Sequence, residues 1–327
     1  MNRDQAIALI KDTNYTNFNE MAMRVLSFQS EKVLPFQLFQ RLTGFRLNGH
    51  VLPEWIPFLP ISLFKSHEII THGLEPEVIY YSSSTSGKGP SRHLVHDNTV
   101  YQASYQRAFE HFYGKPEEWC ILCLLPGYLE REGSSLIAMA HDLVAQSQDP
   151  DSGFFLYDHE TLNAVLQKKR ETGTKTLLLG VSFALLDFAE KFQLPPSDLV
   201  VMETGGMKGR KKEIVRHELH SILKEKLGVK SIHSEYGMTE LLSQAYSSGE
   251  GIFRCPPWMR IVVREQNDPF SANLIGKRGR ICVIDLANVF SCSFIETEDL
   301  GIVYEDGSFE VLGRIDHSDL RGCNVMV

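Results

Sequence analysis

One short stretch, residues 80–95 (YYSSSTSGKGPSRHLV), concentrates groups that could bind phosphate. It holds six serine and threonine hydroxyls, two glycines, Lys88 and Arg92, which together could supply hydroxyl donors, accessible backbone amides and positive charge. The stretch is not a Walker A loop, because Ser82 and Gly89 stand where that motif needs a glycine and a hydroxyl residue. A solvated loop is the other interpretation, and the stretch alone leaves both open.

A second stretch, METGGMKGRKKE, ends a predicted strand. Gly205 and Gly206 would let a flat ring or a backbone approach closely. Lys208 and Arg210 lie at the start of the next predicted helix, where positive charge opposes the helix dipole. A bound anion would resolve that conflict, and a solvated basic turn is the alternative.

A third stretch, SIHSEYGMTELLSQAY, predicts a short strand followed by the start of a helix. Glu240 would then lie in the first helical turn. There its carboxylate could either stabilise the helix dipole or hold Mg²⁺. Taken alone, the first of these roles is favoured.

The surrounding pattern predicts an α/β fold. From residue 77, short apolar runs alternate with amphipathic helical segments, which is typical of a buried, mostly parallel sheet covered on both faces. Residues 1–76 predict a helical segment that docks on this core, 77–250 the α/β core, and 251–327 a small β subdomain. Ligands bind at the carboxyl ends of such strands, where all three stretches lie.

Composition narrows the class of protein. The 327 residues are 43% hydrophobic, as in ordinary soluble globular proteins, and carry a formal net charge of −8. This charge argues against a nucleic-acid-binding surface. We expect a cytoplasmic protein without a membrane span, because no signal-peptide or 18-residue apolar pattern is present. Six cysteines are too few for a disulfide framework.

The motifs are informative in combination. In chain order they are the Ser/Thr/Gly-rich loop, the Gly-Gly loop, YGMTE, TEDLG followed by DG, and GRIDHSDLRG. Over residues 80–327 this order resembles the adenylate-forming superfamily of acyl-CoA synthetases, peptide-synthetase adenylation domains and luciferases. ETGGMKGRKKEI and the terminal RGC are similar to one branch, the LuxE-type acyl-protein synthetases of bacterial fatty acid reductase, near relatives of phenylacetate–CoA ligases. The resemblance implies the large-domain fold of that superfamily, here with the large C-terminal domain absent, and ATP and Mg²⁺ as cofactors.

The resemblance also implies roles for individual residues. The phosphate-wrapping loop and the adenine pocket would comprise Ser82, Ser83, Ser84, Thr85, Ser86 and Gly87, then Gly205, Gly206, Tyr236 and Gly237. Thr239 would lie near the α-phosphate and Glu240 would hold Mg²⁺. Asp299 would bind the ribose hydroxyls, and Arg314 would lie near the domain hinge.

The same resemblance predicts a ligase that activates a long-chain fatty acid as an acyl-adenylate. A carboxylate is a poor electrophile, whereas an acyl-adenylate can expel AMP. The enzyme must neutralise the pyrophosphate leaving group with Mg²⁺ and cations. Ser91 replaces the lysine that usually follows the proline of the first loop, and the superfamily's C-terminal-domain lysine has no counterpart. Lys88, Lys208, Lys211 or a partner protein would then supply the charge.

Cys323 is the predicted acyl acceptor. It follows Arg321 and Gly322 near the end of the sequence, and a neighbouring guanidinium favours the nucleophilic thiolate. In LuxE-type proteins a cysteine near the C-terminus carries the acyl group, which an acyl-accepting reductase or transferase would then unload. Two alternatives stay open: an acyltransferase that uses a preformed acyl donor, and a non-catalytic nucleotide-binding partner subunit.

Overall fold

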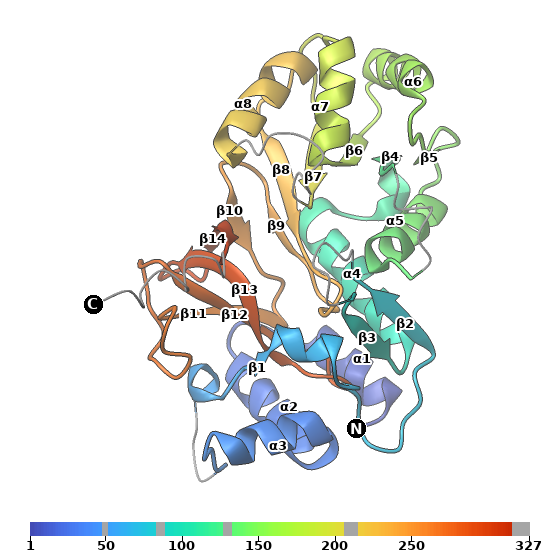
Figure 1. Cartoon of the computed structure of the whole chain (residues 1–327). Coiled ribbons are helices and arrows are strands. Elements are labelled where there is room, and N and C mark those ends of the chain that lie inside the picture. Colours follow the sequence, from blue (N-terminus) through green and yellow to red (C-terminus); the bar gives the residue numbers. More distant parts are fainter. Residues whose placement is uncertain (48–51, 83–88, 127–132, 206–214, 316–327) are drawn as a thin grey trace, which may run out of the picture.

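The computed structural model of this chain describes residues 1–47, 52–82, 89–126, 133–205 and 215–315 (Figure 1). The α/β fold predicted from the sequence is confirmed. Five parallel strands follow the order β8-β7-β6-β4-β5. They are β4 (Cys120–Leu124), β5 (Gly153–Phe154), β6 (Thr176–Val181), β7 (Val200–Thr204) and β8 (Ile232–Tyr236).

The connecting helices cover this parallel region. They are α5 (Ser135–Gln146), α6 (His159–Thr172), α7 (Ser182–Lys191) and α8 (Arg216–Leu227). Every residue of β4 and β6 is buried, including Cys120 and Cys123, which explains why these strands read as continuous apolar runs. Figure 1 shows α6, α7 and α8 together at the top of the molecule.

Beyond β8 the sheet continues as antiparallel strands, so it is mixed and only partly parallel. The order is β11-β12-β13-β14-β10-β9-β8. These strands are β9 (Ala245–Ser247), β10 (Ile252–Arg254), β11 (Met259–Arg264), β12 (Gly279–Asp285), β13 (Phe294–Val303) and β14 (Phe309–Arg314). The strands predicted after residue 250 therefore extend the core sheet through β9 and β10.

The N-terminal segment packs against these antiparallel strands. It contains α1 (Arg3–Asp12), α2 (Phe18–Lys32) and α3 (Leu34–Leu42), then the short 3-10 helices η1 (Pro53–Trp55) and η2 (Ile61–Lys65) on either side of β1 (Leu59–Pro60). Phe36 stacks on Phe294 of β13 with ring centroids 5.7 Å apart, and β1 pairs with β13 in parallel. Buried aromatic rings therefore join α3 to β13.

A separate hairpin precedes the core. β2 (Val78–Tyr81) and β3 (Arg92–Val95) pair antiparallel, and α4 (Asn98–Tyr113) follows, with Asp97 accepting a hydrogen bond from the Thr99 amide at 3.0 Å. Asp97 is thus the N-cap of α4. A third 3-10 helix, η3 (Pro116–Glu118), leads from α4 into β4.

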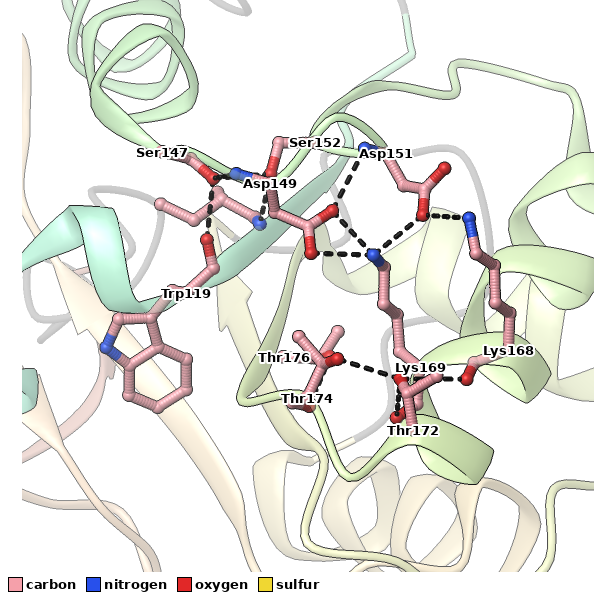
Figure 2. A network of polar contacts seen from close by, with 11 residues as sticks. Trp119, Ser147, Asp149, Asp151, Ser152, Lys168, Lys169, Thr172, Thr174 and Thr176 are labelled. Carbon is pink, nitrogen blue, oxygen red and sulfur yellow. Dashed lines mark hydrogen bonds and ion pairs between the residues drawn. The ribbon is translucent and has the colours of Figure 1, made fainter.

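A buried ion-pair network fastens the free edge of the sheet (Figure 2). Lys169 of α6, whose side chain is 6% exposed, lies 2.6 Å from Asp149 and 2.7 Å from Asp151. Ser152 accepts a hydrogen bond from the Ile121 amide at 2.9 Å, which joins the network to β4. β5 has only two residues, and these contacts link α6, the loop before β5 and β4 at this edge.

No helix among the described residues is long and apolar enough to span a membrane. Within the same residues, no group of three or more His, Cys, Asp or Glu side chains is placed to hold a metal ion.

Candidate active site

Three predicted site residues from three strands lie in contact. The Tyr236 hydroxyl, at the end of β8, donates a hydrogen bond of 2.9 Å to Oδ2 of Asp299 on β13. Nε of Arg314 at the end of β14 lies 3.3 Å from Oδ1 of the same carboxyl group. Burial raises the pKa of Asp299, and the Arg314 charge and the Tyr236 hydrogen bond act in the opposite direction. The structure therefore brings Tyr236, Asp299 and Arg314 together as one polar cluster.

The helix predicted to begin near Glu240 is absent from the structure. Thr239 and Glu240 instead form the centre of a turn closed by the Leu241 amide, which donates to the Met238 carbonyl at 3.0 Å. The chain then leads into β9. The prediction was wrong because it rested on local sequence.

Asp285, at the end of β12, accounts for this conformation. Its buried carboxylate accepts hydrogen bonds from the Leu242 and Ser243 amides at 2.8 and 3.0 Å, and from the Ser243 hydroxyl at 2.6 Å. A partner distant in sequence therefore holds both amides where the chain turns toward β9.

The Glu240 side chain is buried at the site, with 5% of the residue exposed. Burial raises the pKa of its carboxyl group, whereas a hydrogen bond with Ser91 and the charges of Arg314 and Lys65 favour the ionised form. The carboxylate is thus a candidate oxygen ligand for a hard cation. Sequence reasoning missed Lys65, which lies at the end of η2 and carries no motif.

The Gly-Gly loop begins at the carboxyl end of β7, next to β8. Gly205 has φ +65°, a left-handed conformation that glycine adopts without strain, and its carbonyl accepts a hydrogen bond from Ser182 at 2.8 Å. Thr204 donates a hydrogen bond to Glu235, the neighbour of Tyr236. Burial raises the pKa of Glu235 to about 7, and repulsion from Glu203 adds to the rise.

At position 237 of the YGMTE motif there is no room for a side chain, which favours glycine. A Cβ atom built on this residue would lie 2.3 Å from Oε1 of Glu235, and that carboxylate is already engaged by Thr204. A side chain at position 237 would therefore have to displace the Glu235 carboxylate from Thr204.

The predicted phosphate loop is described only at its stem. The Ser82 amide donates to the Ser91 carbonyl at 3.1 Å, and the Ser91 amide donates to the Ser82 hydroxyl at 2.8 Å. Because Ser91 also contacts Glu240, the stem lies beside the YGMTE turn. The other predicted site residues lie outside the described residues: Ser83, Ser84, Thr85, Ser86, Gly87, Lys88, Gly206, Lys208, Lys211 and Cys323.

Comparison with known proteins finds similarity in structure alone. No protein-family model matches the sequence. No curated protein matches it either. An open conformation of 2-hydroxyisobutyryl-CoA ligase, in complex with 2-HIB-AMP and CoA, superposes with a TM-score of 0.66 at 13% identity and covers 93% of this chain and 70% of the ligase. ATP-bound MatB from Rhodopseudomonas palustris gives 0.55 at 18% identity and covers 72% of this chain and 47% of MatB.

These similarities define the fold class. The chain has the α/β fold of the large domain of the adenylate-forming acyl-CoA ligases. It spans about half the length of MatB and of two MatB chimeras that it also matches, at 47 to 49% of each.

Proposed function

We propose that this protein is an ATP-dependent ligase that activates a carboxylic acid as its acyl-adenylate. The contacts of Asp299 with Tyr236 and Arg314, together with the buried Glu240, carry the proposal. Asp299 contacts the last residue of β8 and Glu240 follows that strand, so both carboxyl groups would serve a ligand at the carboxyl end of the parallel strands, where this class of sheet binds ligands. The fold shared with an acyl-CoA ligase that binds an acyl-AMP supports the same reaction.

In this reaction a carboxylate oxygen of the acid attacks the α-phosphorus of ATP. A new bond forms between this oxygen and the α-phosphorus. The bond between the α-phosphorus and the oxygen that bridges to the β-phosphate breaks, and pyrophosphate leaves. The chain's own residues bind and orient the reactants. Asp299 would accept hydrogen bonds from the ribose hydroxyls, Tyr236 would lie against the adenine ring, and Thr239 would lie near the α-phosphate.

Glu240 fits a divalent cation, because it is a buried carboxylate whose ionised form needs a compensating charge. Mg²⁺ bound there would supply positive charge to the triphosphate. Lys65 adds a cation to the vicinity of Glu240, alongside the Lys88 and Lys208 predicted from the sequence.

The finer assignment is a LuxE-type acyl-protein synthetase. The acid would be a long-chain fatty acid, and the acyl group would pass from AMP to the Cys323 thiol with formation of a thioester and release of AMP. A reductase or transferase would then take the acyl group from Cys323. The motifs ETGGMKGRKKEI and RGC support this assignment.

Pyrophosphate release tests the proposal against its alternatives. The protein is incubated with ATP, Mg²⁺ and a fatty acid, and pyrophosphate and AMP are measured. The proposal predicts release of both that depends on the fatty acid. An acyltransferase would release neither and would take an acyl group only from a preformed donor, and a non-catalytic subunit would bind ATP without cleaving it.

A further inference from the structure

The turn that carries Glu240 is held from outside by two fully buried side chains. His93 comes from β3, and Asn288 comes from the loop between β12 and β13. Nδ1 of His93 lies 2.7 Å from the Thr239 carbonyl oxygen. Nδ2 of Asn288 donates a hydrogen bond of 2.8 Å to the Glu240 carbonyl oxygen.

The two side chains also contact each other, with Nε2 of His93 3.0 Å from Oδ1 of Asn288. Thr239 and Glu240 are the central residues of the turn, so the carbonyl group of each central residue has its own buried partner. Fixing both carbonyls fixes the rotation of both peptide units. The direction in which the Glu240 side chain leaves the backbone follows from that rotation.

Packing around the pair leaves it little freedom. The His93 ring meets Phe64 of η2 edge to face, with centroids 5.7 Å apart. On the far side, Nε2 of Gln29 donates to the carbonyl oxygens of Asn288 and Val289 at 3.0 and 2.9 Å. Gln29 thus holds the loop that carries Asn288, through the backbone of that loop.

We propose that His93 and Asn288 are positioning residues that fix the Thr239–Glu240 backbone and so aim the Glu240 carboxylate at the Mg²⁺ of bound MgATP. The metal-binding part of this inference rests on the proposed function, whereas the fixing of the turn does not. The pair also links β3, at the stem of the phosphate loop, to the YGMTE motif, so two loops of the site share one support.

Three variants of the full chain separate positioning from general stability. His93→Phe keeps an aromatic ring against Phe64 but has no donor, and Asn288→Leu keeps similar volume without the amide. Gln29→Leu is the matched control, because it also removes a buried amide that holds the same loop. Asn288→Ser is a smaller change that keeps the test valid if a bulkier variant does not fold.

The first measurement is the dependence of pyrophosphate release on Mg²⁺ concentration. For the His93 and Asn288 variants we expect the KM for Mg²⁺ to rise at least fivefold, with kcat at saturating Mg²⁺ within twofold of the wild type. For Gln29→Leu we expect a lower melting temperature and a KM for Mg²⁺ within twofold of the wild type. Equal KM changes in all three variants would overturn the proposal.

The second measurement needs no activity. Amide hydrogen exchange at Leu241, whose N–H closes the turn, should accelerate at least tenfold in the His93 and Asn288 variants relative to Gln29→Leu. Unchanged exchange would overturn the role of the pair. Accelerated exchange in a protein that never binds MgATP would support the fixing of the turn and would instead refute the proposed function.

Discussion

The Tyr236 hydroxyl and the Asp299 carboxylate lie 2.9 Å apart, although β9, β10 and β14 separate their strands in the sheet. Four interstrand spacings in a flat sheet would put β8 and β13 about 19 Å apart. The sheet must therefore curve strongly between them. Phe253 of β10 and Phe309 of β14 pack edge-on against the Tyr236 ring in this bend. The site exists because the antiparallel strands fold back toward the end of the parallel ones.

Asp299→Asn should raise the KM for ATP at least tenfold. An ionised carboxylate accepts stronger hydrogen bonds from ribose hydroxyls than an amide does, and a loss of about 1.4 kcal/mol corresponds to a factor of ten. Steady-state pyrophosphate release checks this. Tyr236→Phe, which keeps the ring, should have the smaller effect, and an unchanged KM in Asp299→Asn would argue against ribose binding.

Glu240→Gln should lower the rate of acyl-adenylate formation at least tenfold while leaving the melting temperature equal or higher. The amide loses the charge that Mg²⁺ requires, and burial already disfavours that charge in the free protein. The rate is measured at limiting Mg²⁺. Glu305→Gln, at an exposed turn, is the control. Full activity of Glu240→Gln would contradict Mg²⁺ binding by Glu240 and would leave this residue only a structural role.

The fully buried His93 should make stability depend on pH. Burial lowers its pKa to about 4, below the ordinary 6.5, so the unfolded chain binds the extra proton between these values. The contribution of His93 is present above pH 6.5 and is lost as the pH falls toward 4, by about 3 kcal/mol in total. Urea unfolding of His93→Gln between pH 4 and 7 should show a smaller loss on acidification than the wild type. An identical loss in both proteins would contradict this account.

Glu235 should contribute a pH dependence of the opposite sign. Its raised pKa, about 7, means that the folded protein binds the extra proton between pH 4.5 and 7, so this contribution is lost as the pH rises. Glu235→Gln resembles the protonated form and should gain stability relative to the wild type from pH 5 to pH 8. The comparison uses the same unfolding assay, and a constant difference across that range would contradict the prediction.

Cys323→Ser should abolish acyl labelling of the protein without abolishing adenylation. A serine hydroxyl is a far weaker nucleophile than a thiolate at neutral pH. The check is hydroxylamine-sensitive incorporation of a labelled fatty acid in the presence of ATP and Mg²⁺. The five described cysteines are all buried, so Cys255→Ser is a suitable control. Full labelling of Cys323→Ser would place the acceptor elsewhere.

The parts of the fold that depend on local pattern could be predicted from the sequence. The continuous apolar strands and the Asp97 cap depend on a few neighbouring residues. The order of the motifs indicates Tyr236, Asp299 and Arg314, which lie in contact in the structure. The TEDLG motif, however, lies inside one long strand, β13. No local sequence pattern predicts that β13 continues through this motif, because its pairing with β12 and β14 determines its length.

Tertiary contacts decided the rest of the site. The conformation after Glu240 depends on Asp285, which is 42 to 43 positions from the amides that it binds. His93 and Thr239 are in contact but lie 146 positions apart in the sequence, so no local pattern predicts this contact. Lys65 belongs to a segment that reads only as apolar and proline-rich, and its proximity to Glu240 comes from the docking of η2. Contacts of this kind, between residues far apart in the sequence, could be identified only from the structure.

Oxygen transfer from the acid to AMP is the most direct test of the central claim. A fatty acid labelled with ¹⁸O in its carboxylate is incubated with the protein, ATP and Mg²⁺, and the AMP is analysed by mass spectrometry. If an acyl-adenylate forms and its acyl group is then transferred to a thiol, the bridging oxygen stays on phosphorus and AMP gains one ¹⁸O. AMP without ¹⁸O, or label found in inorganic phosphate together with ADP, would contradict the account.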